Sequence, residues 1–116
     1  MLGAHPNVLI VANEQKQKAA VEALTPYLRQ PVIVMNSGFE SSLPLDGSVI
    51  VPSIGDLTLR EQVALFNWLE ERGRDTQLVS LSAMQLFPLV SAGKFLEDLY
   101  YRINIVQFEA AESVLS

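Results

Sequence analysis

The chain contains no cysteine and only one histidine, His5, among its 116 residues. These two shortages exclude a disulfide framework, a thiolate metal site and a histidine cluster, so we expect no bound metal ion and assign His5 no role. Long apolar runs are also missing, because none approaches the roughly 20 residues that a membrane-spanning helix needs. The N-terminus lacks the basic-then-apolar pattern of a signal peptide, and we therefore expect a cytoplasmic protein.

Positive charge is scarce as well. Eight Lys and Arg residues face thirteen Asp and Glu residues, which gives a formal net charge of −5. This balance opposes the basic surface that generic nucleic-acid binding requires, so we expect no direct DNA contact by this segment and no membrane contact. Because 49% of the residues are apolar and 18% are charged, we expect residues 1–116 to fold as one domain.

Short apolar segments alternate with segments of helical periodicity along the chain. Several of the apolar segments are rich in β-branched residues, as in strands that are covered on both faces. We predict strands at residues 7–12, 31–35, 48–51, 77–81 and 103–108. We predict helices that begin at Glu14, at the capping pair Thr58 and Glu61, at the pair Ser82 and Gln85, and near Phe95. This alternation predicts a parallel sheet with helices on both faces.

The helix after Thr58 shows the clearest amphipathic pattern. Helical spacing predicts an apolar face made of Leu59, Val63, Phe66 and Leu69, with Leu65 and Trp68 beside it. Gly73 is placed to end the helix in a left-handed conformation. The segment between residues 36 and 47 has turn-forming residues and no periodicity, which predicts a loop.

Two segments resemble the central AAA+ ATPase domain of sigma-54-dependent transcriptional activators. Residues 93–105 (GKFLEDLYYRINI) resemble the family segment G-R-F-R-E-D-L-Y-Y-R-L-N-V. Residues 47–57 (GSVIVPSIGDL) resemble the family's Walker B segment, G-T-L-F-L-D-E-I-G-D-L. The helix that follows, with Gln62 and Leu65, also fits the family pattern. The resemblance covers about residues 46–107 and, more weakly, residues 7–18.

This resemblance implies a three-layer αβα sandwich with a five-stranded parallel sheet of order 5-1-4-3-2, the P-loop NTPase or AAA+ core. It also implies a nucleotide site at the carboxyl end of the first strand. Family members carry a lid and a DNA-binding domain further along, whereas this chain ends just past the fifth predicted strand, so we expect the core without the lid. The family's sigma-54-contacting G-A-F-T-G-A loop has no counterpart in the eleven residues between Met35 and Gly47.

The segment that corresponds to the family's phosphate-binding loop contains no glycine. A P-loop needs glycines because its backbone curls around the phosphates and points amide hydrogens inward. Residues 12–19 contain none, and no glycine occurs between Gly3 and Gly38. Lys18 stands where the family places its phosphate-binding lysine, so it is the one candidate nucleotide-binding residue. An exposed helical lysine without a ligand is the alternative interpretation.

The positions that would carry the family's hydrolytic chemistry are also replaced. Pro52 and Ser53 stand where the family has the aspartate that holds Mg²⁺ and the glutamate that activates water. Ser82 and Ala83 stand in place of the Thr-Asn pair of the sensor strand. We therefore predict no catalytic residue, no enzymatic activity, and no bound cofactor, with ATP and Mg²⁺ not favoured.

Arg102 is the remaining candidate for an arginine finger, because Leu96 replaces the other arginine of the family segment. In this role, the resemblance implies that Arg102 would present its charge to a neighbouring subunit. The alternative is an ion pair with Glu97 or Asp98 within the same chain.

Three functional hypotheses follow. The first is a sigma-54 activator-like pseudo-ATPase that acts in bacterial transcription regulation through contact with a protein partner or by self-association. The second is a weak ATP-binding core of a transcriptional regulator, which uses Lys18 and the N-terminus of the first helix. The third is a receiver-like signalling domain, for which Asn13 with Glu14 and Pro52 with Ser53 supply a poor acidic cluster. Whether this chain is a complete protein or a fragment of a longer one is left open.

Overall fold

A computed structural model describes residues 6–39, 43–44, 46–72 and 76–110. His5 and Gly73 lie outside the described residues. Five strands form one parallel sheet of order β2-β3-β4-β1-β5. In chain order the elements are β1 Val8–Ala12, α1 Glu14–Leu24, the 3-10 turn Thr25–Tyr27, β2 Val32–Val34, β3 Gly47–Val51, the 3-10 turn Ile54–Asp56, α2 Leu59–Arg72, β4 Thr76–Ser82, α3 Phe87–Ser91, α4 Glu97–Ile103 and β5 Val106–Ala110.

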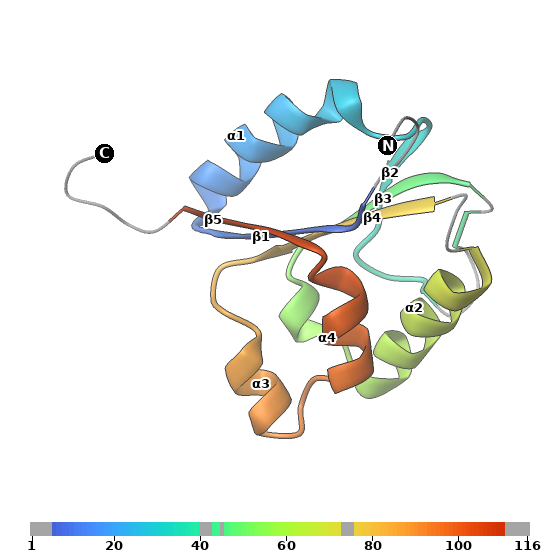
Figure 1. Ribbon diagram of the computed structural model, residues 1–116, viewed down its shortest axis with the longest axis vertical. Coiled ribbons are helices and arrows are strands. Elements are labelled where there is room, and N and C mark those ends of the chain that lie inside the picture. Colours follow the sequence, from blue (N-terminus) through green and yellow to red (C-terminus); the bar gives the residue numbers. More distant parts are fainter. Residues whose placement is uncertain (1–5, 40–42, 45, 73–75, 111–116) are drawn as a thin grey trace.

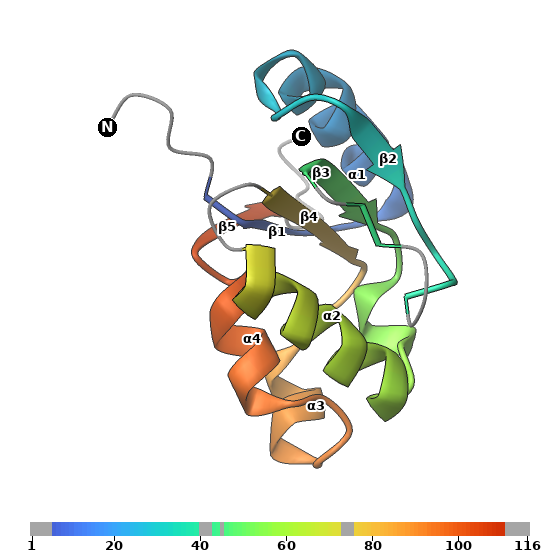
Figure 2. The ribbon, with the colours of Figure 1, turned by 90° about the vertical axis from the view of Figure 1, so that its right-hand side faces the viewer.

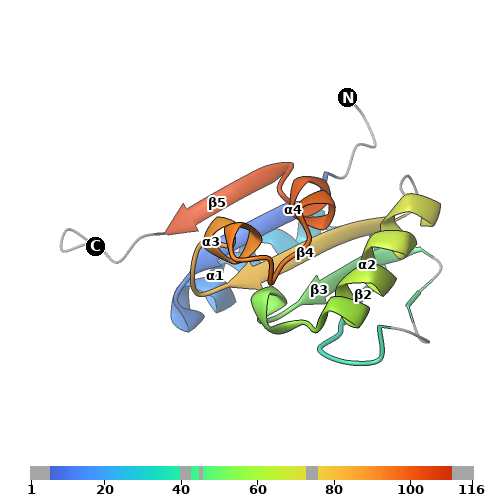
Figure 3. The same cartoon turned by 90° about the horizontal axis from the view of Figure 1, so that it is seen from below.

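The sheet lies between two helical layers, as Figure 1 shows. Helix α1 covers one face, and α2, α3 and α4 cover the other, which is turned toward the viewer in Figure 3. The strand order is 5-1-4-3-2 when it is read from the β5 edge. The predicted three-layer αβα sandwich and its strand order are therefore confirmed.

Each sheet face has its own apolar core. The larger core lies beneath α2, α3 and α4 and includes Leu65 and Leu69 of α2 and Leu99 and Ile103 of α4. The smaller core lies beneath α1, where Val8, Ile10 and Val79 of the sheet meet partly buried side chains of the helix. Strands β1, β3 and β4 are buried along their whole length, as their unbroken apolar runs predict.

The predicted face of α2 is wrong at Leu59 and Val63, which are about half exposed (50% and 47%). Leu69 of that face and the flanking Leu65 and Trp68 are buried, as predicted. The helix carries two apolar stripes. The stripe with Leu59 and Val63 faces solvent, and the stripe with Leu65 and Leu69, which also contains the buried Gln62 side chain, faces the sheet. The predicted capping pair is confirmed, because the Thr58 hydroxyl accepts from the amide of Glu61 (3.1 Å) and the Glu61 carboxylate accepts from the amide of Thr58 (2.9 Å).

Two further expectations are corrected. The segment at residues 31–35 is not a buried strand, because β2 is an edge strand whose Ile33 and Val34 are exposed. Ser82 does not begin a helix, since α3 starts five residues later at Phe87. The last strand also starts later than predicted, because Ile103 ends α4 and Val106 begins β5.

The connection from β2 to β3 runs on the face that α2 covers. Phe39 is buried in the larger core, and the indole Nε1 of Trp68 donates a hydrogen bond to the carbonyl of Pro44 (2.7 Å). This contact holds the described part of the connection against α2. Within the described ranges, no helix is long and apolar enough to cross a membrane.

Gly47 opens β3 in a conformation that only glycine adopts without strain. Its φ is +94°, and a Cβ atom there would lie 2.4 Å from the carbonyl oxygen of Pro31. We expect Gly47→Ala to lower the free energy of unfolding by at least about 2 kcal/mol, because backbone strain and steric overlap act together. Urea denaturation measures this loss.

Gly93→Ala is the matched control. Gly93 also has a positive φ (+75°), but an added Cβ would meet no atom within 4 Å. We expect only the conformational cost of about 1–2 kcal/mol. Equal losses for the two variants would contradict the close approach at Pro31.

Candidate functional site

The candidate site lies at the edge of the sheet where β1, β3 and β4 end. Because these strands are parallel, their carboxyl ends meet at one edge, which is where open α/β sheets bind ligands. The edge brings Asn13, Pro52, Ser53 and Ser82 to neighbouring strand ends. The structure therefore groups the replaced Walker B and sensor positions with Asn13, whereas Arg102 lies in α4 beside Asn7, at the opposite end of β1.

The first strand passes into α1 through a single residue. Strand β1 ends at Ala12 and α1 begins at Glu14, so only Asn13 lies between them. A phosphate-binding loop requires several residues between the strand and the helix. At this junction the chain turns directly into the helix and forms no loop that could surround a phosphate.

The N-terminus of α1 is closed by the chain's own side chains. The Asn13 Oδ1 atom accepts a hydrogen bond from the amide of Lys16 (2.8 Å). The Gln17 side chain donates to the carbonyl of Ala12 (2.6 Å). Glu14 places a carboxylate in the first turn, where it interacts favourably with the helix dipole. The Asn13 side chain therefore bonds one amide of the first turn, and Glu14 adds negative charge to the turn where an anion would bind.

Lys18 lies in the second turn of α1 and is exposed. Its ammonium group makes no hydrogen bond or ion pair with the part of the chain that the structure describes. Of the amides that precede it, that of Lys16 is bonded to the Asn13 side chain and that of Gln17 to the Asn13 carbonyl (2.8 Å), so neither is free for a phosphate. Its role as a nucleotide-binding residue stays a prediction.

The end of β3 is a tight turn. Pro52 follows the last strand residue, and Ser53 adopts a left-handed conformation (φ 52°, ψ 49°). The Ser53 carbonyl accepts from the amide of Asp56 (2.9 Å), which starts the 3-10 turn. Neither side chain offers a carboxylate for a metal ion or for water activation.

The end of β4 is also closed on itself. The Ser82 hydroxyl accepts from the amide of Met84 (3.2 Å) and donates to the carbonyl of the same residue. This local turn uses the hydroxyl that the sequence comparison placed at the sensor position. We infer that Ser82 shapes the chain after β4.

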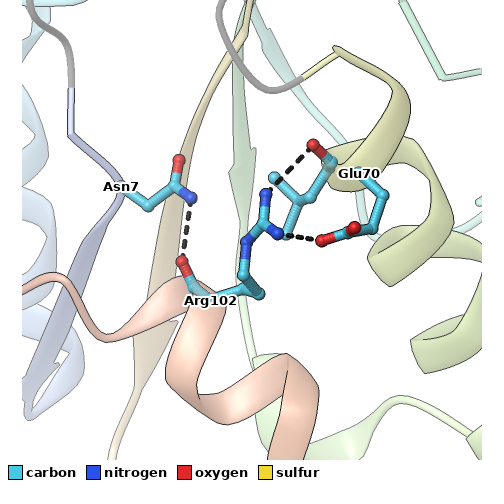
Figure 4. A network of polar contacts seen from close by, with 4 residues as sticks. Asn7, Glu70 and Arg102 are labelled. Atoms are coloured by element: carbon cyan, nitrogen blue, oxygen red, sulfur yellow. Dashed lines mark hydrogen bonds and ion pairs between the residues drawn. The ribbon is translucent and has the colours of Figure 1, made fainter.

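Arg102 lies between α4 and α2, as Figure 4 shows. Its Nη1 atom forms an ion pair with the carboxylate of Glu70, and its Nη2 atom donates to the carbonyl of Leu69 (3.3 Å). The Arg102 carbonyl accepts from the Asn7 side chain (2.9 Å). The proposed intrachain partner was therefore wrong: Arg102 pairs with Glu70 of α2, and neither Glu97 nor Asp98 is its partner.

Gln62 makes the most extensive buried polar contact of α2. Its Nε2 atom donates to the carbonyls of Leu57 and Lys94 (3.0 Å each), and its Oε1 atom accepts from the amide of Leu96 (2.8 Å). The side chain is fully buried. Gln62 therefore joins the turn after β3 to the segment before α4, the two regions that carry the sequence resemblance.

Other residues of the two resembling segments also serve packing. Ile54, Phe95, Leu99 and Ile103 are buried in the larger core. At Gly55, an added Cβ would lie 3.1 Å from a methyl group of Leu89. The resembling segments thus specify how the α2, α3 and α4 layer packs on the sheet.

The geometry of this sheet and its helices defines the class: the chain has the P-loop NTPase or AAA+ fold. The sigma-54 activator P-loop NTPase domain from E. coli matches 93% of this chain and 84% of its own, with a TM-score of 0.62 and 14% identity. NtrX from Brucella abortus, solved in complex with ATP, matches 93% of this chain and 32% of its own, with a TM-score of 0.69 and 15% identity.

Over about half of its length, the chain is homologous to sigma54-dependent transcriptional regulators. It is 35% identical over 74 residues to the regulator SfnR of Pseudomonas fluorescens, which covers 54% of this chain and 20% of SfnR. It is 34% identical over 74 residues to ZraR of Salmonella typhimurium, and this match covers 54% of this chain and 17% of ZraR. The chain thus spans about a fifth or less of the length of these relatives. No family model matches it.

We expect Gln62→Leu to lower the free energy of unfolding by about 3 kcal/mol. The substitution keeps the volume of the side chain but leaves two carbonyls and one amide without their partner, and unpaired buried groups carry most of the cost. Chemical denaturation measures the change. Gln15→Leu on the exposed side of α1 is the matched control and should stay within about 0.5 kcal/mol of the parent. If Gln62→Leu also stays within about 0.5 kcal/mol of the parent, the bridging role of Gln62 is contradicted.

For Arg102→Ala we expect a loss of less than about 1 kcal/mol. The Arg102 and Glu70 side chains are 39% and 47% exposed, so water screens the ion pair. The loss should shrink further when the denaturation is repeated at high salt. A salt-independent loss comparable to that of Gln62→Leu would show that the pair is a principal support of the fold.

Proposed function

We propose that this chain is a sigma-54 activator-like AAA+ core that does not hydrolyse ATP and that acts in transcription regulation through contact with other proteins. The observation that supports the proposal most strongly is the closed junction between β1 and α1. Asn13 occupies the helix N-terminus with its own side chain, and a single residue replaces the phosphate-binding loop.

The positions required for hydrolysis support the same proposal. Phosphoryl transfer to water needs a metal ion that neutralises charge and a residue that orients the attacking water. The turn after β3 presents Pro52 and Ser53 at these positions, and the hydroxyl of Ser82, the last residue of β4, is held by the backbone of Met84. A serine hydroxyl without an activating base is a poor proton acceptor near neutral pH.

The retained packing supports a role for the surface of the domain. Gln62, Phe95 and Leu99 hold the α2 to α4 layer in place although the chemistry-bearing positions have been replaced. A domain that keeps the family's packing but not its catalytic residues can still present a surface to a protein partner. The relatives that share this scaffold are transcriptional regulators, which suggests regulation of transcription as the process.

Isothermal titration calorimetry with Mg-ATP tests the proposal. We expect no saturable heat up to about 1 mM nucleotide, the upper end of ordinary enzyme KM values, and no phosphate release above the buffer rate. The E. coli sigma-54 activator domain, prepared in the same way, is the comparison protein.

Lys18→Ala separates the proposal from a weak ATP-binding core. Micromolar binding that disappears in Lys18→Ala would overturn the proposal and support nucleotide binding through this lysine. Turnover of ATP by the purified chain would overturn it as well.

A further inference from the structure

Strand β2 forms one edge of the sheet and lies at the right-hand side of the sheet in Figure 2. On its inner side, the carbonyl of Pro31 accepts from the amide of Ser48 (2.8 Å), and the amide of Met35 donates to the carbonyl of Ile50 (2.9 Å). Alternate residues of a strand direct their backbone groups to opposite sides. Val32 and Val34 therefore turn their N–H and C=O groups outward, where no described residue pairs with them.

The side chains of this edge are apolar and partly uncovered. Val34 is 61% exposed on the face of α1, and Ile33 is 39% exposed on the opposite face. No charged residue occurs from Gln30 to Phe39. Charged side chains, bulges and prolines normally protect open edges against pairing with another chain. In β2, only Pro31 lies close by, and it precedes the two outward-facing residues.

The opposite edge of the sheet is protected. Strand β5 carries the exposed Glu109, whose carboxylate accepts from the Gln107 side chain (2.8 Å). Two copies that met along β5 would bring these carboxylates together, and like charges on facing strands repel each other. The two edges therefore differ in charge: β5 carries an exposed carboxylate that disfavours pairing with a second strand, and β2 carries no charged residue.

We propose that two copies of this chain associate reversibly through antiparallel pairing of their β2 edges about a two-fold axis. In this arrangement, the N–H and C=O groups of Val32 pair with those of the partner's Val34, and the reverse pair forms by symmetry. The Ile33 side chains of the two copies face each other at the axis. The result is a ten-stranded sheet with each helical layer continued on its own side.

The absence of charge at the β2 edge permits a second copy as the occupant. The chain carries a net charge of −5, so two copies repel each other least where the local surface is uncharged, as it is from Gln30 to Phe39. The edge is also self-complementary, with two donors and two acceptors that match their own rotated image. Because β2 has only three residues, the contact is smaller than a standard interface, and the dimer is weak and concentration-dependent.

Sedimentation velocity from about 10 μM to about 1 mM protein tests this dimer. We expect the weight-average sedimentation coefficient to rise with concentration toward the dimer value. Val34→Lys should weaken the association roughly tenfold or more, because two added charges would face the edge. Val34→Pro should weaken it as well, since proline removes an outward N–H that β3 does not use.

Ile105→Lys is the matched control, because Ile105 is equally exposed (60%) but lies outside the β2 edge. Its association should stay within roughly twofold of the parent. A chain that stays monomeric at the highest concentration would overturn the proposal. Equal weakening by Val34→Lys and Ile105→Lys would also overturn it, since the contact would then be a nonspecific apolar one.

Discussion

The packing of this molecule depends on the buried side chain of Gln62. One amide group satisfies two carbonyls and one backbone amide that belong to two different segments, the turn after β3 and the segment before α4. In a buried environment such groups must be paired, so the three bonds tie α2 to the turn after β3 and to the segment that leads into α4. The segments that resemble sigma-54 activators meet at this amide, which explains why they form one structural unit although 46 residues separate Gly47 from Gly93, where they start.

The candidate site has been closed by equally local interactions. At the ends of β1, β3 and β4, an asparagine cap, a left-handed serine turn and a serine hydroxyl bonded to the next turn occupy the sheet edge. Each of these satisfies backbone groups that a ligand would otherwise meet. The same chain therefore keeps the architecture that places a site at this edge and fills the edge with its own polar atoms. We propose that this combination marks a scaffold that acts through its surface.

Much of the fold could be predicted, because apolar strands alternate with helical segments and the resemblance of two segments to a known family implies the order of the sheet. The errors have physical causes. The apolar sequence of β2 cannot distinguish a central strand from an edge strand, and α2 carries two apolar stripes of which tertiary packing covers one. At the site, the missing glycines and the replaced acidic residues were visible in the sequence. The partner of Arg102 was not, because Glu70 precedes it by 32 residues and approaches only after α2 and α4 pack.

The central claim is that the N-terminus of α1 is already occupied by Asn13 and is not open to phosphate. The most direct measurement is an NMR titration of the amide resonances of residues 14–16 with Mg-ATP. The account predicts that these resonances keep their chemical shifts while the cap holds the Lys16 amide. Saturable shifts confined to these three amides and to the Lys18 side chain would contradict it, because they would place the nucleotide at the helix N-terminus.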